Sequence, residues 1–232
     1  GYRLVGEKAQ VLDAVGADAL IVPARTSGEP GDAEGVSIFL VEKGATGLTV
    51  ERQTRLDHRN AAILRLDGVA CGQGALLGPV GKGAALLSEV IDRATVVLCA
   101  EMLGGMSEAF DLTLEYLKTR EQFGVPIGRF QALQHRAAKL YMEIELSRSC
   151  VMAAARAMDA GQQDAAKLVS LAKARCSDAY VLAGNEGVQF FGGVGMTDEY
   201  DIGFYLKRAR ASELTFGDSS FHRTRWGRLG DY

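Results

Sequence analysis

The hydrophobic period of this chain changes near residue 80, and that change limits the folds open to it. Before this point, β-branched runs such as 19–23 and 36–41 alternate with Gly, Pro and Asp. After it, apolar residues recur every three or four positions, beginning with Leu87, Ile91, Ala94 and Leu98. A period of two is typical of strands and a period of 3.6 of helices. The sequence therefore predicts an α+β fold, with a β-domain over 1–79 and a helical domain over 80–232.

The β-rich part is expected to form a partial antiparallel sheet. Two further strand-like runs lie at 48–51 and 62–66, and the loop at 26–32 is short and rich in turn residues. Short turns join antiparallel strands, whereas parallel strands need long crossover segments. A sheet of so few residues is expected to lack some of the strands that would cover it.

The helical part is expected to form an antiparallel four-helix bundle. Each periodic segment is longer than the mean helix of about 11–12 residues, and the links between segments are short. The segments cover about 83–117, 130–160, 163–191 and 202–217, and glycines mark the ends of the last three.

Composition weighs against several classes of function. The net charge of −3 gives no support to nucleic-acid or anionic-membrane binding, and no apolar run reaches the roughly 18 residues of a membrane span. The four cysteines are far apart and fit no metal site, so we expect reduced thiols inside the fold. The three histidines show no metal-binding spacing either. We expect a cytoplasmic protein without a bound metal.

Residues 119–131, with the sequence T-R-E-Q-F-G-V-P-I-G-R-F-Q, form the first candidate site. They lie between two predicted helices, and Pro126 with its neighbouring glycines favours a tight turn. Arg120 can hold a phosphate through a forked pair of hydrogen bonds while Phe123 packs beside it. A helix connection with a solvated arginine explains the same residues.

Residues 189–196, with the sequence Q-F-F-G-G-V-G-M, form the second candidate site. Three glycines in four positions allow positive φ angles and a close approach of a ligand to the backbone. No strand precedes them, so they do not form the glycine-rich dinucleotide motif that follows a strand. A plain glycine cap of the preceding helix is the alternative interpretation.

Taken together, these two segments on a helical bundle resemble the C-terminal half of acyl-CoA dehydrogenases. The resemblance covers essentially all of 1–232, with 1–79 similar to the second half of that family's middle β-domain. The family's N-terminal helical domain has no counterpart in these residues. Within the family, the stretches 98–101, 116–120 and 216–218 are most similar to small subunits of pimeloyl-CoA dehydrogenases.

The resemblance implies an FAD cofactor held between the subunits of a homo- or heterotetramer. Arg120 and Phe123 then contact the diphosphate and adenosine portions of FAD, and the glycine-rich segment reaches the FAD of the neighbouring subunit. An arginine offsets diphosphate charge, and glycines expose backbone N–H groups. The full set of implied cofactor contacts is Arg120, Gln122, Phe123, Phe130, Gln131, Leu133, Gln189, Phe190, Gly192 and Gly193.

The resemblance also implies a reaction, but this chain departs from the family at the catalytic base. The family removes a proton from the acyl α-carbon and transfers a hydride from the β-carbon to the flavin, and its base is usually a glutamate near the C-terminus. Phe216 stands at that position, and Ala94 stands at the alternative base position on the first bundle helix. On the β-strand that faces the flavin, Gln10 and Leu12 replace the Trp and Thr that are usual in the family.

Three carboxylates are candidates for a relocated base. Asp218 lies two residues beyond the usual position, Glu101 lies seven residues after Ala94 on the same helix face, and Glu213 precedes Phe216 by three. Each has a solvated or structural role as its alternative. We select Asp218, because a shift at the adjacent Gly217 would aim it inward. A positioned base contributes roughly 10²–10⁴ in rate, so its loss would cripple the reaction.

Three functions therefore remain open. The first is an FAD-dependent acyl-CoA dehydrogenase acting on a thioester such as a dicarboxylyl- or steroid-side-chain-CoA, with an electron-transfer flavoprotein as acceptor. The second is a supporting subunit without a base, paired with a catalytic acyl-CoA dehydrogenase chain. The third is another acyl-CoA reaction on the same fold, such as an elimination.

Overall fold

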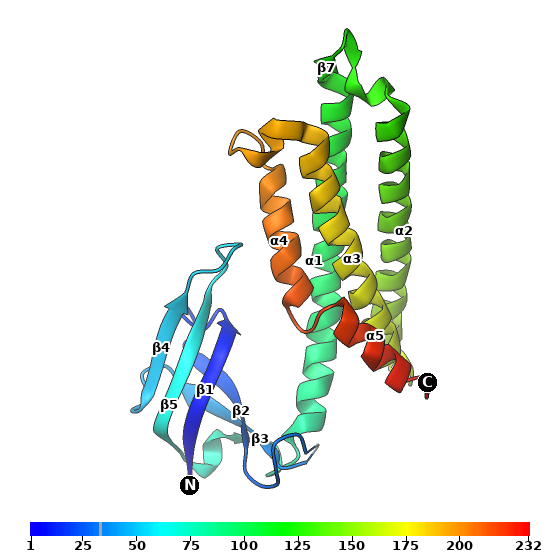
Figure 1. Ribbon diagram of the computed structural model, residues 1–232. Coiled ribbons are helices and arrows are strands. Elements are labelled where there is room, and N and C mark those ends of the chain that lie inside the picture. Colours follow the sequence, from blue (N-terminus) through cyan, green and yellow to red (C-terminus); the bar gives the residue numbers. More distant parts are fainter. Residues whose placement is uncertain (33) are drawn as a thin grey trace. The chain divides into compact units, whose positions relative to one another are not determined.

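The computed structural model describes residues 1–32 and 34–232 (Figure 1). The chain forms two compact units, Gly1–Val90 and Ile91–Tyr232. The first unit is built from antiparallel sheets and the second from helices. The α+β fold class predicted from the change of period is confirmed.

The β unit consists of two three-stranded antiparallel sheets, ordered β1-β5-β4 and β2-β3-β6. The strand bounds are β1 Tyr2–Leu12, β2 Ala19–Arg25, β3 Val36–Glu42, β4 Leu48–Gln53, β5 Ala61–Cys71 and β6 Leu76–Leu77. The long strand β1 pairs along β5 with a register shift between Lys8 and Val11. Gln10, inside this irregularity, has a φ of 55°. This irregularity has the character of a β-bulge and lies at Gln10, one of the two residues that the resemblance predicts to face the flavin.

The alternating pattern of β2 and β3 explains how the two sheets pack. Leu20 and Val22 of β2 are buried, whereas Ile21 between them is 65% exposed. Phe39 of β3 is fully buried and meets residues of the other sheet, such as Leu64, in one apolar cluster. Successive side chains of a strand point to opposite faces, so one face of each sheet builds this core.

The helical unit contains four long bundle helices and a short fifth. Their bounds are α1 Gly83–Thr119, α2 Gln131–Asp159, α3 Ala165–Phe191, α4 Ile202–Leu214 and α5 Ser219–Arg228. The four predicted helices are confirmed, and the fourth breaks before Gly217, as expected. Within this unit α3 contacts α2, α4 and α5 (Figure 1). None of the described helices combines the length and apolar character that a membrane span requires.

The cysteines are free thiols, but one of them departs from the expected burial. Cys71, Cys99 and Cys176 are buried, whereas Cys150 on α2 is half-buried. Burial raises the pKa of the Cys71 and Cys150 thiols, so both stay protonated at neutral pH. The thiols therefore behave as small apolar side chains.

Small residues on the helices set how closely the bundle packs. Gly105 of α1 faces α3, and a Cβ added there would lie 2.3 Å from the hydroxyl oxygen of Tyr180. Tyr180 is buried, and burial raises its pKa to about 12. The neighbouring Gly104 has open space around the same position.

This difference predicts opposite effects of the same substitution at adjacent residues. Gly105→Ala should lower the free energy of unfolding by about 1–3 kcal/mol, because the rigid buried ring of Tyr180 must move. Gly104→Ala should raise it by up to about 1 kcal/mol through helix propensity. Denaturant unfolding of both variants provides the measurement. Equal stabilities would contradict the packing argument.

Candidate functional site

The first candidate segment folds into a tight hairpin between α1 and α2. Strands β7 Glu121–Gln122 and β8 Val125–Pro126 pair antiparallel, and the N–H of Ile127 donates to the carbonyl of Arg120 at 2.8 Å. Phe123 and Gly124, the two residues at the turn, have φ angles of 57° and 77°. Two consecutive positive φ angles fit the hairpin turn whose twist matches the flanking strands.

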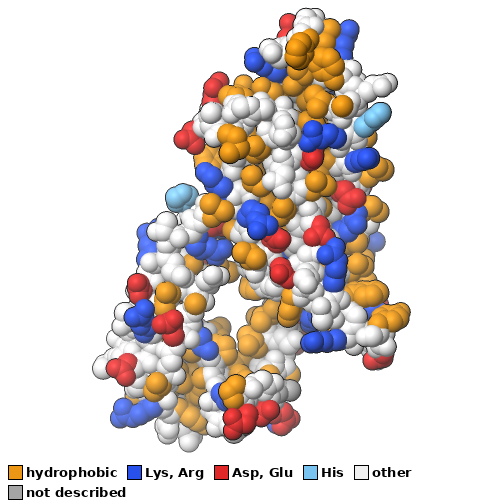
Figure 2. Space-filling model, in the orientation of Figure 1, with side chains coloured by type: hydrophobic (Ala, Val, Ile, Leu, Met, Phe, Trp, Pro, Cys, Tyr) orange, Lys and Arg blue, Asp and Glu red, His pale blue; other side chains and the backbone are white. Residues whose placement is uncertain are grey.

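The hairpin places an exposed aromatic ring beside an exposed cation. The side chain of Phe123 is 90% exposed, and its ring meets the ring of Phe130 edge-on at 6.1 Å. Arg120 is exposed as well. Two neighbouring exposed rings on a hairpin that also carries an exposed arginine are consistent with a binding surface. Figure 2 shows hydrophobic side chains gathered at this end of the helical unit, with basic ones beside them.

The second candidate segment forms the end of α3 and a following short 3₁₀ helix, Gly192–Met196. Gly192 has a φ of 68°, and a Cβ added at Gly192 or at Gly193 would meet no atom within 4 Å. Gln189 is exposed beside them. The backbone of this segment is therefore open to the approach of a ligand.

An aromatic cluster brings the two segments to the same end of the bundle (Figure 1). The ring of Tyr116, on the last turn of α1, stacks on Phe191 at 4.1 Å, and Tyr200 meets both rings edge-on. The hydroxyl of Tyr116 also donates to the carbonyl of Phe191 at 3.3 Å. The hairpin and the glycines are thus held together, although about 70 residues separate them in the sequence.

Arg136, which sequence analysis did not select, also belongs to this end. Its guanidinium lies 4.9 Å from the ring centroid of Phe190 and pairs with Glu186 at 2.7 Å. Phe190 itself is buried, so any contact of this residue with a ligand would use its backbone. Arg136 lies three residues after the selected Leu133 on α2, and this helical spacing was the available signal.

Phe216, at the position where the resemblance predicts the catalytic base, lies in the turn between α4 and α5. Phe216 has a φ of 60° and packs against the main core of the bundle. A bulky residue in the left-handed region is an outlier that surrounding contacts must maintain. The turn therefore presents residue 216 in one defined direction.

Asp218 has a structural role in the same turn. It is the N-cap of α5, and its Oδ1 accepts a hydrogen bond from the N–H of Phe221 at 2.8 Å. The other two candidate carboxylates form ion pairs within the helical unit. Glu101 pairs with Arg208 at 2.6 Å, and Glu213 pairs with Arg210.

His222 holds the turn from α5. Its Nε2 lies 3.0 Å from the carbonyl oxygen of Phe216, which can only accept, so Nε2 carries the proton. Burial lowers the pKa of His222, the Phe216 carbonyl raises it, and the cations of Lys173 and Arg225 lower it further. Asp92 acts in the opposite direction. The imidazole is therefore neutral at pH 7.

The lowered pKa predicts a loss of stability in acid. Above the unfolded value of 6.5, both states hold a neutral His222, so this group adds no pH dependence. Below it, the unfolded chain takes up the proton first, and the free energy of unfolding should fall. Urea unfolding at several pH values measures the slope. His222→Gln keeps a donor for the Phe216 carbonyl and should reduce the slope; equal slopes would contradict this assignment.

Comparison with known proteins identifies the family. A family model described as acyl-CoA dehydrogenase, C-terminal domain, matches residues 81–229. The chain belongs to the acyl-CoA dehydrogenase family. It is 33% identical over 234 residues to the mitochondrial isovaleryl-CoA dehydrogenase of Solanum tuberosum, covering 98% of this chain and 56% of that protein.

Solved structures of acyl-CoA dehydrogenases share the fold of both units. Butyryl-CoA dehydrogenase from Megasphaera elsdenii is 27% identical with a TM-score of 0.93, covering 100% of this chain and 61% of that one. The FAD complex of PigA is 30% identical with a TM-score of 0.93, covering 99% and 61%. The chain thus spans little more than half the length of the acyl-CoA dehydrogenase relatives it matches.

The described residues fit the FAD on which acyl-CoA dehydrogenases depend. Arg120 offers an uncovered cation to a diphosphate, and Phe123 offers an exposed ring to an adenosine. The bare backbone at Gly192 and Gly193 leaves room for a phosphate or ribose to approach. Gln122, Phe130 and Gln131 are exposed on the same segment, and Leu133 is half-buried against the core.

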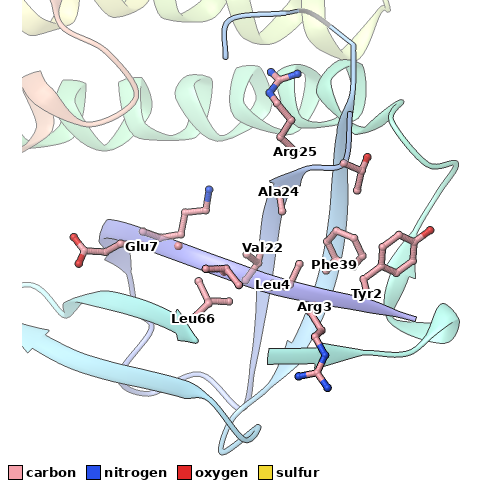
Figure 3. A pocket seen from close by; sticks show the side chains of 13 residues that line it. Tyr2, Arg3, Leu4, Glu7, Val22, Ala24, Arg25, Phe39 and Leu66 are labelled. Carbon is pink, nitrogen blue, oxygen red and sulfur yellow. The ribbon is translucent and has the colours of Figure 1, made fainter. Parts of the chain in front are cut away.

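The β unit of this acyl-CoA dehydrogenase chain contains a separate cavity of about 560 Å³ between its two sheets (Figure 3). Leu4, Val22 and Leu66 give it an apolar lining. Arg25 lies at its margin, but its guanidinium is occupied by backbone carbonyls, including that of Glu34 at 2.8 Å. On β1 the lining ends at Lys8, so the predicted flavin-facing residues 10 and 12 lie outside it. The charged residues Arg3, Glu7 and Lys8 of β1 also line the cavity, so its lining is mixed.

Proposed function

We propose that this chain forms part of an FAD-dependent acyl-CoA dehydrogenase that desaturates the α,β bond of an acyl-CoA thioester. The observation that carries the proposal is that an exposed arginine, an exposed phenylalanine and two uncovered glycines lie at the same end of the bundle. We further propose a thioester of the dicarboxylyl-CoA or steroid-side-chain-CoA class, following the sequence likeness to pimeloyl-CoA dehydrogenase small subunits.

The length of α3 supports an assembly of several chains. The turn that carries Phe216 packs beside Lys173, whereas the glycines follow Phe191, eighteen residues further along the helix. At 1.5 Å per residue, the two sites are roughly 27 Å apart along the axis. One compact catalytic centre cannot use both. In the proposed homo- or heterotetramer, the glycine segment contacts the FAD of the neighbouring chain. The turn that carries Phe216 belongs to the catalytic site of its own chain.

When bound, FAD supplies the hydride acceptor of this reaction. The chain's own residues bind and orient: Arg120 offsets diphosphate charge, and the turn fixes the direction of residue 216. Asp218 is our candidate for the base. Only its Oδ1 takes part in the cap, which leaves Oδ2 for a proton. An electron-transfer flavoprotein is the proposed acceptor of the electrons, and the cytoplasm the proposed compartment.

A second candidate function is a supporting subunit in a heteromeric acyl-CoA dehydrogenase. A specific observation favours it, because Phe216 cannot accept a proton and Asp218 is engaged as a helix cap. In this alternative the chain contributes its hairpin and glycine segment to the FAD site of a catalytic partner chain.

Anaerobic flavin bleaching separates the two functions. The full-length protein, loaded with FAD, is mixed with acyl-CoA and dicarboxylyl-CoA thioesters, alone and with candidate partner chains. Bleaching by the protein alone supports the dehydrogenase. Bleaching that requires a partner chain indicates the second function, a supporting subunit. An absence of both FAD binding and bleaching under every condition would reject the proposal.

Asp218→Asn tests the base without disturbing the helix. Asparagine caps helices as well as aspartate does, so the hydrogen bond to the N–H of Phe221 is retained. If Asp218 is the base, this variant should lose roughly 10²–10⁴ in the bleaching rate. Asp198→Asn, at an exposed site outside this turn, is the matched control. Unchanged bleaching in Asp218→Asn would remove Asp218 from the mechanism.

A further inference from the structure

We propose that Lys173 is a positioning residue that fixes the turn carrying residue 216, and so sets the direction in which that side chain points. The relevance to catalysis rests on the proposed function, whereas the mechanical role does not. Lys173 lies in the first half of α3, far from the glycine segment at the end of that helix, and it is fully buried.

The ammonium group of Lys173 has a complete set of partners. Its Nζ lies 2.8 Å from the carbonyl oxygen of Gly217, 2.9 Å from that of Glu213 and 3.0 Å from the hydroxyl of Ser177. An ammonium has three donors and no acceptor. Three acceptors therefore match three N–H bonds, and the side chain is oriented in one way.

Two of these acceptors flank residue 216. The Glu213 carbonyl belongs to the last turn of α4, where helix carbonyls lack partners within the helix. The Gly217 carbonyl follows Phe216 directly. Between them, His222 of α5 holds the carbonyl of Phe216 itself. Side chains from α3 and α5 thus hold three backbone carbonyls within five residues, on both sides of the left-handed Phe216.

The identity of residue 173 is not explained by core packing alone. Burial of an ammonium has a desolvation cost, and a methionine of similar length would fill the same space without it. Burial indeed lowers the pKa of Lys173, and nearby Glu213 and Asp218 act against this lowering. What a methionine cannot do is donate to the turn. The bonds of Lys173 to the turn are therefore its distinguishing contribution.

Hydrogen exchange of Lys173→Met in the full-length protein tests the mechanical role. We expect the amides of 213–217 to exchange at least about tenfold faster, while the protection of α2 is unchanged. Lys139→Met, at an exposed lysine of α2, is the control and should leave the turn unaffected. Unchanged exchange in the turn, or an equal rise throughout the bundle, would overturn the proposal. If Lys173→Met does not fold, Lys173→Gln, which keeps one or two donors, should show a smaller rise confined to the same residues.

A second measurement links the position to function. In a Phe216→Glu background, Lys173→Met should lower the limiting rate of flavin bleaching at least about tenfold. The acyl-CoA concentration for half-maximal rate and the FAD affinity should stay unchanged, which a general loss of structure would not allow. A rate equal to that of Phe216→Glu alone would overturn the catalytic relevance. If Phe216→Glu never bleaches flavin, the proposed function fails, but the exchange result still decides the role of Lys173.

Discussion

Phe216→Glu is expected to increase the rate of flavin bleaching by acyl-CoA by about 10²–10⁴, the usual contribution of a positioned base, where the unchanged chain is the supporting subunit without a base of its own. The substitution places a carboxylate at the base position that the family resemblance predicts, on a turn where residue 216 has a φ of 60°. Lys173 and His222 hydrogen-bond to three backbone carbonyls of this turn. These bonds hold the backbone in place and so fix the direction of the new side chain. The measurement is the anaerobic bleaching rate of the FAD-loaded full-length protein with excess thioester.

Phe216→Gln is the control for this prediction. It has the shape of the glutamate and the same backbone demands, but it cannot accept the α-proton. Its bleaching rate should therefore stay near that of the unchanged protein. Combining Phe216→Glu with Asp218→Asn adds a further distinction. If Asp218 is already the base, Phe216→Glu adds little by itself and rescues Asp218→Asn. An equal rate for the Glu and Gln variants would mean that residue 216 does not face the thioester.

Most of the longer elements of the fold were predictable from the sequence because local spacing determines them, whereas β6 and the short helix α5 were not among the predicted segments. The period of α3 is set by residues such as Val169, Cys176 and Tyr180, which recur on its buried faces, and its end is marked by Gly192. The alternation of β3 likewise follows from the pleat of a strand. These signals lie within a few residues of each other, so no tertiary information is needed to detect them. The family resemblance supplied what local spacing does not, namely the link between the hairpin and the glycine segment.

The contacts that define the candidate site were not predictable in the same way. In the sequence, nothing distinguishes Lys173 from any other lysine of an alanine-rich helix. Its partners Glu213 and Gly217 lie 40 and 44 residues away. Periodicity places a residue on a face, but it does not reveal which carbonyl lies opposite. Asp218 is a different case. An aspartate immediately before a helix is a known N-cap signal, and it competes with the interpretation of the same residue as a base.

Asp92→Ala is expected to lower the free energy of unfolding of the helical unit by about 3–5 kcal/mol, the usual cost of breaking a buried ion pair by removing one partner. Both oxygens of Asp92 on α1 pair with Arg225 on α5, each at 2.7 Å. Arg225 also donates to the hydroxyl of Ser170 on α3 at 3.1 Å. Only 7% of Asp92 and 23% of the Arg225 side chain are exposed, so removal of the carboxylate leaves a largely buried guanidinium without its counter-charge.

The matched control for Asp92→Ala is the exposed pair of Glu115 and Lys118 on α1, whose side chains are 68% and 65% exposed. Glu115→Ala should cost no more than about 1 kcal/mol, because water screens this pair. The double variant Asp92→Leu with Arg225→Met should recover most of the stability lost in Asp92→Ala, since apolar side chains remove both desolvated charges together. Denaturant unfolding of the four proteins decides the matter. If Asp92→Ala costs no more than Glu115→Ala, the ion pair does not join α5 to the bundle. The turn at residue 216 would then be held by its other contacts, which include the hydrogen bonds from Lys173 and His222.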